Sequence, residues 1–238
     1  MLVAVLPARL ESTRLPRKML ADIGGEPLIV HTWRRVLAAG VADKVVIATD
    51  SDEIADISAG FGATVVRTGP CPNGTVRVAE AAKSLGLSHR DCILNVQGDE
   101  PLVAMPTLRT IAFGVQDFGA EIATGSAELP ASEAENPNRV KVVESLGRAL
   151  YFSRSAIPHG GPFRVHVGVY AYTNAALQRI VAYPEHALER SEGLEQLRWL
   201  AYGEGIAVHA VASPAPSVDT AEDLAVVRQI VASAAARG

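Results

Sequence analysis

The sequence predicts an α/β domain that combines a mostly parallel sheet with a smaller lobe of mixed or antiparallel strands. Over residues 1–100, short apolar runs alternate with segments of helical periodicity, which is typical of repeated strand–helix–strand units. Beyond residue 101 the expected strands follow one another through short connections, which indicates antiparallel pairing. The 238 residues, 48% of them hydrophobic, can form one large domain with a well-buried core.

The first half contains four expected strands and three expected helices. The strands are 2–6, 44–49, 64–66 and 92–96. The helices are 27–39, 52–61 and 75–85. The strands are apolar without polar alternation, as in strands that are buried on both faces. Pro27 suits a first helical position, and Gly40 and Gly86 suit helix ends, so the boundaries are consistent with right-handed crossovers between parallel strands.

The second half contains the predicted lobe, at about residues 120–175, and the elements that close the chain. Strands are expected at 121–127, 139–144, 148–153 and 163–173. Helices at 175–182 and 191–202, a strand at 207–212 and a helix at 221–235 follow. The whole chain, residues 1–238, is expected to form a single domain, because no linker or internal repeat interrupts it.

Ligands of parallel sheets bind beyond the carboxyl ends of the strands, where four loops are predicted at 7–18, 49–52, 67–75 and 97–101. The first loop concentrates four cationic side chains within ten residues, namely Arg9, Arg14, Arg17 and Lys18. Such a loop can bind phosphates, although a solvated basic loop has the same composition. It lacks the glycine pattern of a Walker A loop or of a dinucleotide-binding fingerprint.

Two carboxylates are candidate ligands for a metal ion. Asp99 follows a predicted buried strand in Asn-Val-Gln-Gly-Asp-Glu-Pro (95–101), where the alternative is a simple Gly-Asp turn. Either Asp219 or Thr220 is expected to cap the last helix, and Asp219 is the alternative second metal ligand. Among the histidines no metal-ligand spacing is found, and His166 remains a candidate for ligand contact.

Composition excludes several other classes. A net charge of −4 gives no general attraction to nucleic acid or to a lipid surface. Two cysteines do not make a disulfide framework, and the apolar start is too short for a membrane span. A cytoplasmic location is expected.

Taken together, these segments resemble the 3-deoxy-manno-octulosonate cytidylyltransferase family over nearly the whole chain. The landmarks include Pro-Ala-Arg-x-x-Ser-Thr-Arg-Leu-Pro-x-Lys at 7–18 and the 95–101 segment, together with 48–50, 74–77, 136–141, 151–154, 166–170, 194–198 and 218–220. The resemblance implies a Rossmann-like, glycosyltransferase-A-like fold and a homodimer whose subunit contact lies near the lobe. It also implies that a small acid attacks the α-phosphorus of CTP, with Mg²⁺ as cofactor and pyrophosphate as leaving group.

The resemblance implies roles for particular residues. The residues that it implies bind the nucleotide are Pro7, Ala8, Arg9, Ser12, Arg14, Lys18, Gly74, Arg77 and Gln97. Acceptor binding falls to Gln97, His166, Tyr170, Glu195 and Gln196, to which we add Arg17. Mg²⁺ binding falls to Asp99 and Asp219, and catalysis to Lys18, Asp99 and Arg9.

Three features depart from the family pattern and concern the acceptor. Arg17 stands where glycine is usual, Val76 stands where glutamate is usual, and the connection 159–165 is short. The first two changes make the site region more positive, and a phosphonate acceptor needs more cationic partners than a sugar acid does. A phosphonate such as phosphonoformate is therefore one expected acceptor, and 3-deoxy-manno-octulosonate or a similar sugar acid is the other. With this short connection, both outcomes remain for the family dimer: it is kept, or it is lost.

Two other functions remain as alternatives. A glycosyltransferase of similar fold would carry an Asp-x-Asp metal motif, which Asp50-Ser-Asp52 matches, but the cationic first loop favours a triphosphate substrate. A catalytically inactive nucleotide-binding module is disfavoured because Lys18, Asp99 and Asp219 are all present.

Overall fold

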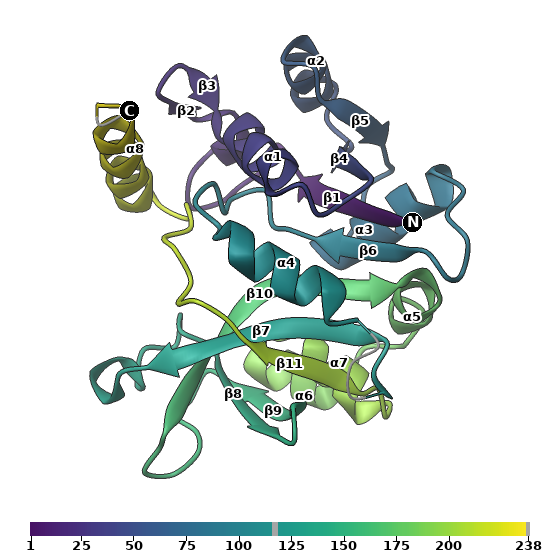
Figure 1. The fold of residues 1–238 in the computed structure, drawn as a ribbon, viewed down its shortest axis with the longest axis vertical. Helices are drawn as coiled ribbons and strands as arrows, with labels where there is room; N and C mark the ends of the chain where they lie inside the picture. The colour runs from purple at the N-terminus through teal and green to yellow at the C-terminus, as the bar shows by residue number, and fades with distance from the viewer. Residues whose placement is uncertain (116–118, 237–238) are drawn as a thin grey trace.

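The computed structural model describes residues 1–115 and 119–236 and arranges them around one sheet of nine strands, in the order β5-β4-β1-β6-β10-β7-β11-β9-β8 (Figure 1). Strand β1 (Leu2–Ala8) lies between β4 (Lys44–Thr49) and β6 (Cys92–Asn95) and is parallel to both. Strand β5 (Thr64–Arg67) adds to β4, also in parallel. The predicted parallel half is therefore confirmed.

The lobe continues the same sheet with mixed strand directions. Strand β10 (Phe163–Thr173) runs antiparallel to β6 and to β7 (Ile122–Leu129), and β11 (Ile206–Ala210) runs parallel to β7. The hairpin of β8 (Lys141–Ser145) and β9 (Arg148–Ser153) pairs with β11 through β9 and with β10 through β8. The predicted mixed lobe is thus confirmed, and it is joined to the parallel half through the β6–β10 pair.

Helices cover both faces of the sheet. One face carries α1 (Leu28–Ala39) and α4 (Met105–Phe113), with α2 (Asp52–Gly60) near the β5 edge (Figure 1). The other face carries α3 (Gly74–Ser84), α5 (Asn174–Ile180) and α7 (Gln196–Ala201), the last after the short α6 (Ala187–Glu192).

Strand β1 explains why two separate cores form. Ala4 and Leu6 belong to the core that α1 and α4 cover, whereas Val3 and Val5 belong to the core that α3, α5 and α7 cover. All four side chains are fully buried, as expected for alternating residues of a central strand.

Three features differ from the sequence prediction. Helix α4 was not predicted. Its buried Leu108 and Ile111 have helical spacing, but the helix is short and its apolar Phe113 is exposed, so the periodic pattern is weak. The predicted single helix at 191–202 is wrong, because Gly193 adopts a left-handed conformation (φ 62°) that ends α6 before α7 begins. A small hairpin of β2 (Asp22–Ile23) and β3 (Glu26–Pro27) precedes α1.

The last helix, α8 (Ala221–Ala235), returns from the lobe to the parallel half. The segment that leaves β11 crosses the molecule and brings α8 beside β2 (Figure 1). Val218, Leu224 and Val227 pack there with Ile23 and Leu28. Two 3₁₀ turns, η1 (Lys18–Leu20) and η3 (Ala131–Glu133), lie in the first loop and after β7. Among the described residues, no helix has the length and apolar character needed to cross a bilayer.

Candidate active site

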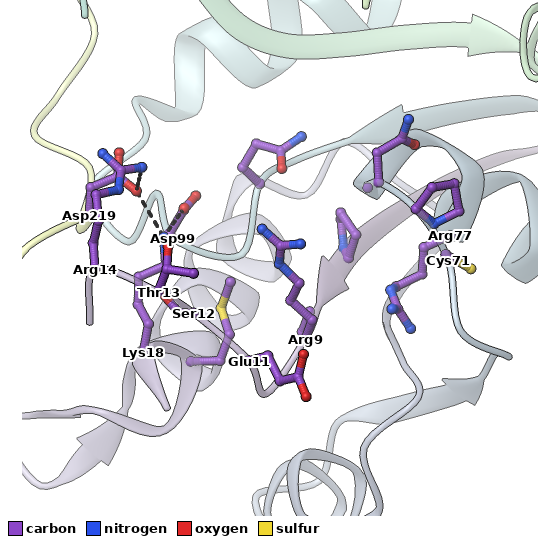
Figure 2. A pocket seen from close by; sticks show the side chains of 17 residues that line it. Arg9, Glu11, Ser12, Thr13, Arg14, Lys18, Cys71, Arg77, Asp99 and Asp219 are labelled. Carbon is purple, nitrogen blue, oxygen red and sulfur yellow. Dashed lines mark hydrogen bonds and ion pairs between the residues drawn. The ribbon is translucent and has the colours of Figure 1, made fainter. Parts of the chain in front are cut away.

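A cavity of about 330 Å³ opens beyond the carboxyl ends of β1 and β6. It is lined by residues 7–9, 11–14 and 18–19, by 71–74 with Arg77, by Gln97 and Asp99, and by Asp219. Figure 2 shows Lys18, Asp99, Asp219 and Arg14 at one end, with Arg77 and Cys71 at the other. All the residues predicted to bind nucleotide line this cavity, so the structure brings them together, while their role in binding remains a prediction.

Lys18 is the centre of the first end. Its ammonium Nζ lies 2.6 Å from Asp99 Oδ2 and 3.0 Å from Asp219 Oδ1, and the residue is only 8% exposed. Burial favours the neutral amine, but the attraction of Asp99 and Asp219 outweighs it and raises the pKa of Lys18 above its ordinary value. Lys18 is therefore a fixed positive charge at neutral pH.

Asp219 reaches this place because the segment before α8 is held at several points. The backbone N–H of Val218 donates to the carbonyl of Asp99 at 3.0 Å, and the Val218 side chain is fully buried. Thr220 caps α8 in a reciprocal capping box with Asp223, which also accepts the N–H of Asp219. Of the two capping candidates Thr220 is therefore the cap, and the Asp219 carboxylate faces Lys18.

The first loop contributes two further cations. Arg14 Nη2 lies 2.9 Å from Asp219 Oδ1, so Arg14 belongs to the same cluster of charges. Arg9 is exposed and lies between the two ends of the cavity (Figure 2). Within residues 1–115 and 119–236 it makes no ion pair. Its charge is available to a ligand with phosphate groups.

Two glycines, Gly74 in the lining of the cavity and Gly98 next to the lining residues Gln97 and Asp99, allow the backbone to approach closely. A Cβ at Gly74 would lie 3.3 Å from Pro7 Cγ and 3.6 Å from Gln97 Oε1. A Cβ at Gly98 would lie 2.8 Å from Ile29 Cδ1 and 3.1 Å from the carbonyl oxygen of Pro7. Gly98 is therefore required by packing against β1 and α1, in addition to turn chemistry.

The predicted acceptor residues fall into a neighbouring cluster that does not line the cavity, Gln97 excepted. His166 and Tyr170 lie on β10 with their ring centroids 5.3 Å apart. Glu195 and Gln196 lie where α7 begins, and Glu195 accepts a hydrogen bond from Thr75, next to Gly74. Burial raises the pKa of the Glu195 carboxyl.

Sequence reasoning missed several polar residues of this cluster. Trp199 packs edge-on against both Tyr170 and Tyr172. The buried Nε1 of Trp199 has no hydrogen-bond partner among the described residues, whereas the hydroxyl of Tyr170 lies beside Thr124 and that of Tyr172 beside Asn95 and Thr75. Buried polar atoms usually have a partner, so this cluster is suited to polar ligand groups or water. Tyr172 was recognisable because it lies two residues after Tyr170 and thus on the same face of the strand.

Arg17 is not brought together with the other acceptor candidates. It does not line the cavity; it lines a neighbouring hollow formed by the same loop, and its guanidinium pairs with Glu53 of α2. Its backbone is left-handed, with φ 57° and ψ 30°, immediately before η1. This conformation explains why glycine suits the position.

We expect Arg17→Gly to raise the free energy of unfolding by about 0.5–1 kcal/mol, because glycine relieves the left-handed strain and the exposed pair with Glu53 contributes little. Arg17→Ala is the matched control, since it removes the same ion pair and keeps the strain. Urea unfolding of the three proteins checks this. A glycine variant less stable than the alanine variant would refute the strain argument.

The Asp50-Ser-Asp52 segment does not form a metal site. Asp50 Oδ2 accepts a hydrogen bond from Arg77 Nη2 at 2.8 Å, whereas the exposed Asp52 pairs with Arg67. The two carboxylates serve different arginines, so this segment gives no support to the glycosyltransferase alternative.

Asp99 and Asp219 fit a Mg²⁺ site. Both carboxylates lie within 3.0 Å of the same ammonium, and carboxylate oxygens are the ligands that Mg²⁺ prefers. The described residues contain no group of three or more His, Cys, Asp or Glu side chains that suits a metal ion. Two carboxylates still match the usual Mg²⁺ arrangement, in which substrate phosphates and water supply the other ligands.

His166 gives a prediction about pH. Burial lowers the pKa of His166 to about 3, and its Nε2 lies 3.0 Å from Thr124 Oγ1. An unfolded histidine takes up its proton near pH 6.5, so between about pH 6.5 and 3 unfolding is accompanied by proton uptake. The contribution of His166 to stability is complete above that window, and the free energy of unfolding falls as the pH falls through it, by up to about 1.4 kcal/mol per pH unit.

Urea unfolding between about pH 7 and 5 measures this slope. We expect His166→Gln to have a shallower slope than the wild type, and His159→Gln, at an exposed position, to keep the wild-type slope. Equal slopes for the wild type and His166→Gln would mean that folded His166 takes up its proton normally.

Several known proteins are similar to this chain in sequence. A family model described as cytidylyltransferase matches residues 3–206. The 3-deoxy-manno-octulosonate cytidylyltransferase of Gemmatimonas aurantiaca is 45% identical over 234 residues, which cover 93% of this chain and 91% of that protein. The protein of the same name from Chlorobium luteolum is 45% identical over 250 residues, which cover 96% of each chain.

Two solved structures are similar as well. CMP:2-keto-3-deoxy-manno-octonic acid synthetase complexed with CTP matches with a TM-score of 0.93 and 36% identity, over 98% of this chain and 99% of that one. A cytidylyltransferase from Leptospira borgpetersenii matches with a TM-score of 0.66 and 18% identity, over 98% of this chain and 87% of that one. The second likeness concerns the fold alone.

Proposed function

This chain belongs to the cytidylyltransferase family and is a nucleotidyltransferase, and we propose that it transfers the CMP unit of CTP to 3-deoxy-manno-octulosonate. The observation that carries the proposal is the cluster in which Lys18 joins Asp99 to Asp219 at the end of a cavity lined by the cationic first loop. A triphosphate needs positive charge and a metal-binding pair of carboxylates at one place, and this cluster offers both.

The reaction requires positioning and charge neutralisation rather than a covalent nucleophile. An acceptor oxygen forms a bond to the α-phosphorus of CTP. The bond between this phosphorus and the oxygen that bridges it to the β-phosphate breaks, and pyrophosphate leaves with the electrons of that bond. The acceptor hydroxyl loses its proton, which passes to the solvent or to the departing pyrophosphate. Lys18, Arg14 and Arg9 offset the charge of the triphosphate and stabilise the departing pyrophosphate.

We propose Mg²⁺ as the cofactor, held by Asp99 and Asp219. When bound, the ion supplies charge neutralisation at the phosphates and lowers the pKa of a coordinated oxygen. Lys18 holds the two carboxylates at one place through its ammonium group.

The acceptor is proposed to bind against Gln97 and the cluster of His166, Tyr170, Glu195 and Gln196. These groups are polar, and the buried Nε1 of Trp199 beside Tyr170 has no partner among the described residues, which suits the hydroxyls of a sugar acid. The relatives with 45% identity carry the name of the sugar-acid enzyme. None of the three departures from the family, Arg17, Val76 and the connection 159–165, lines the cavity, so the phosphonate remains the alternative acceptor rather than the preferred one.

A screen of pyrophosphate release tests this proposal. Purified protein with CTP and Mg²⁺ is offered 3-deoxy-manno-octulosonate, related sugar acids, and small phosphonates including phosphonoformate. We expect release with 3-deoxy-manno-octulosonate and at most background release with phosphonates. Release with phosphonates alone would overturn the choice of acceptor, and no release with any acid would overturn the transfer reaction.

We further propose that two copies associate through the lobe and that the protein works in the cytoplasm. Leu146 and Leu150 of the β8–β9 hairpin are 91% and 59% exposed, which suits an apolar contact between copies. Cys71 and Cys92 are both free thiols, as in a reducing compartment. Light scattering of the wild type and of Leu150→Glu tests the dimer, which the variant should weaken.

A further inference from the structure

The guanidinium of Arg77 is held rigidly at the end of the cavity opposite Lys18 (Figure 2). Arg77 lies in the first turns of α3 and is only 3% exposed. Its Nη2 donates to Asp50 Oδ2 at 2.8 Å, and its Nη1 donates to Thr68 Oγ1 at 2.6 Å. Asp50 follows β4 and Thr68 follows β5, so two neighbouring strand ends fix one side of the guanidinium.

This arrangement leaves donors for a ligand. A guanidinium carries five N–H groups, and the described residues accept hydrogen bonds from Arg77 only at Asp50 and Thr68. Because Arg77 lines the cavity, the remaining N–H groups are available at its nucleoside end. We assign this end to the nucleoside because the proposed function places the triphosphate at the other end, with Lys18, Arg14 and the two carboxylates.

Cytosine and uracil differ in the hydrogen-bonding groups that they offer to an arginine side chain. An arginine side chain only donates hydrogen bonds. Cytosine offers acceptors at O2 and N3, whereas uracil carries an N–H at position 3. A fixed donor that faces this edge therefore favours cytosine and meets a second donor in uracil. A mobile arginine would turn away and discriminate less.

We infer that Asp50 and Thr68 are positioning residues, which hold Arg77 against the cytosine edge and so select CTP over UTP. The inference rests on the proposed function, because it takes the bound nucleotide to be CTP. Asp50 also supplies the negative charge that pairs with the buried guanidinium of Arg77, which would otherwise be desolvated without a counter-charge.

The test compares kcat/KM for CTP and for UTP in pyrophosphate release, with the same acceptor. Asp50→Asn keeps the shape of the side chain and removes its charge, and Thr68→Val removes the hydroxyl at constant volume. The matched control is Asp52→Asn, two residues away, because Asp52 pairs with a different arginine at the exposed surface. We expect the CTP-to-UTP ratio to fall about tenfold or more in Asp50→Asn, to fall less in Thr68→Val, and to stay unchanged in Asp52→Asn.

The outcomes separate this inference from the proposed function. If the wild type binds no CTP in calorimetry and releases no pyrophosphate, the proposed function fails. If the wild type uses CTP and both variants fold but keep the wild-type ratio within about twofold, the positioning role is wrong. Should Asp50→Asn fail to fold, as judged by circular dichroism and its Tm, the ratio in Thr68→Val decides: a fall supports the inference and no fall overturns it.

Discussion

Replacing Lys18 by methionine is expected to lower kcat/KM for CTP by about 10²- to 10³-fold, the range found when one charge-stabilising donor is removed from an active site. Methionine keeps most of the length of the side chain and removes the ammonium that lies within 3.0 Å of both Asp99 and Asp219. Two losses therefore coincide, namely the positive charge beside the triphosphate and the contact that orients both carboxylates.

A second readout separates this role from general damage. Without the ammonium, Asp99 and Asp219 lose their shared counter-charge, so Mg²⁺ alone should raise the Tm of Lys18→Met more than that of the wild type. Lys83→Met, at an exposed position in the last turn of α3, is the control and should keep both activity and Mg²⁺ response. A Lys18 variant with wild-type kcat/KM would show that the charge cluster is not the triphosphate site.

Replacing either proposed metal ligand by asparagine is expected to lower turnover about 10³-fold. Asn is isosteric with Asp, so Asp99→Asn and Asp219→Asn keep the packing around Lys18 and reduce affinity for a hard cation. The loss of several kcal/mol of charge stabilisation in the transition state corresponds to this factor. Raising the Mg²⁺ concentration should recover part of the activity in each single variant.

Rates of pyrophosphate release over a Mg²⁺ titration check this expectation. Asp56→Asn on the exposed side of α2 is the control, because it removes the same charge far from the cavity. If Asp99→Asn turned over at the wild-type rate at every Mg²⁺ concentration, Asp99 would have no place in the metal site.

The parallel half of the fold was predictable because its strands are buried on both faces. Apolar runs such as residues 44–49 carry the signal directly, and Gly40 ends α1 as expected. The lobe was predictable in kind, since short connections force antiparallel pairing. The break between α6 and α7 was not predicted, because Gly193 can either sit inside a helix or end one, and only its left-handed conformation decides.

The residues of the charge cluster around Lys18 differ in how clearly the sequence indicates them. The first loop was recognisable from the density of its charges. Asp219, however, lies 201 residues from Lys18 in the chain, and only the packing of Val218 and the capping of α8 bring the two together. The local pattern offered Asp219 either as a helix cap or as a metal ligand, and only the family resemblance favoured the second role.

Arg17 shows the opposite case, in which composition alone suggests more than the geometry supports. Counted as charge, it belonged with Arg9 and Arg14. Its left-handed backbone instead turns the guanidinium toward Glu53 on α2, outside the cavity. The direction of a side chain depends on the backbone conformation at that residue, which a count of charges does not contain.

Phosphorus NMR of one reaction mixture tests the central claim most directly. The protein is incubated with CTP, Mg²⁺ and 3-deoxy-manno-octulosonate, and the products are quantified together. We predict a new phosphodiester signal from the CMP-linked sugar acid, in equal amount to pyrophosphate, and no such signal with Asp99→Asn. Unchanged CTP, or CTP hydrolysed without the new phosphodiester, would contradict it.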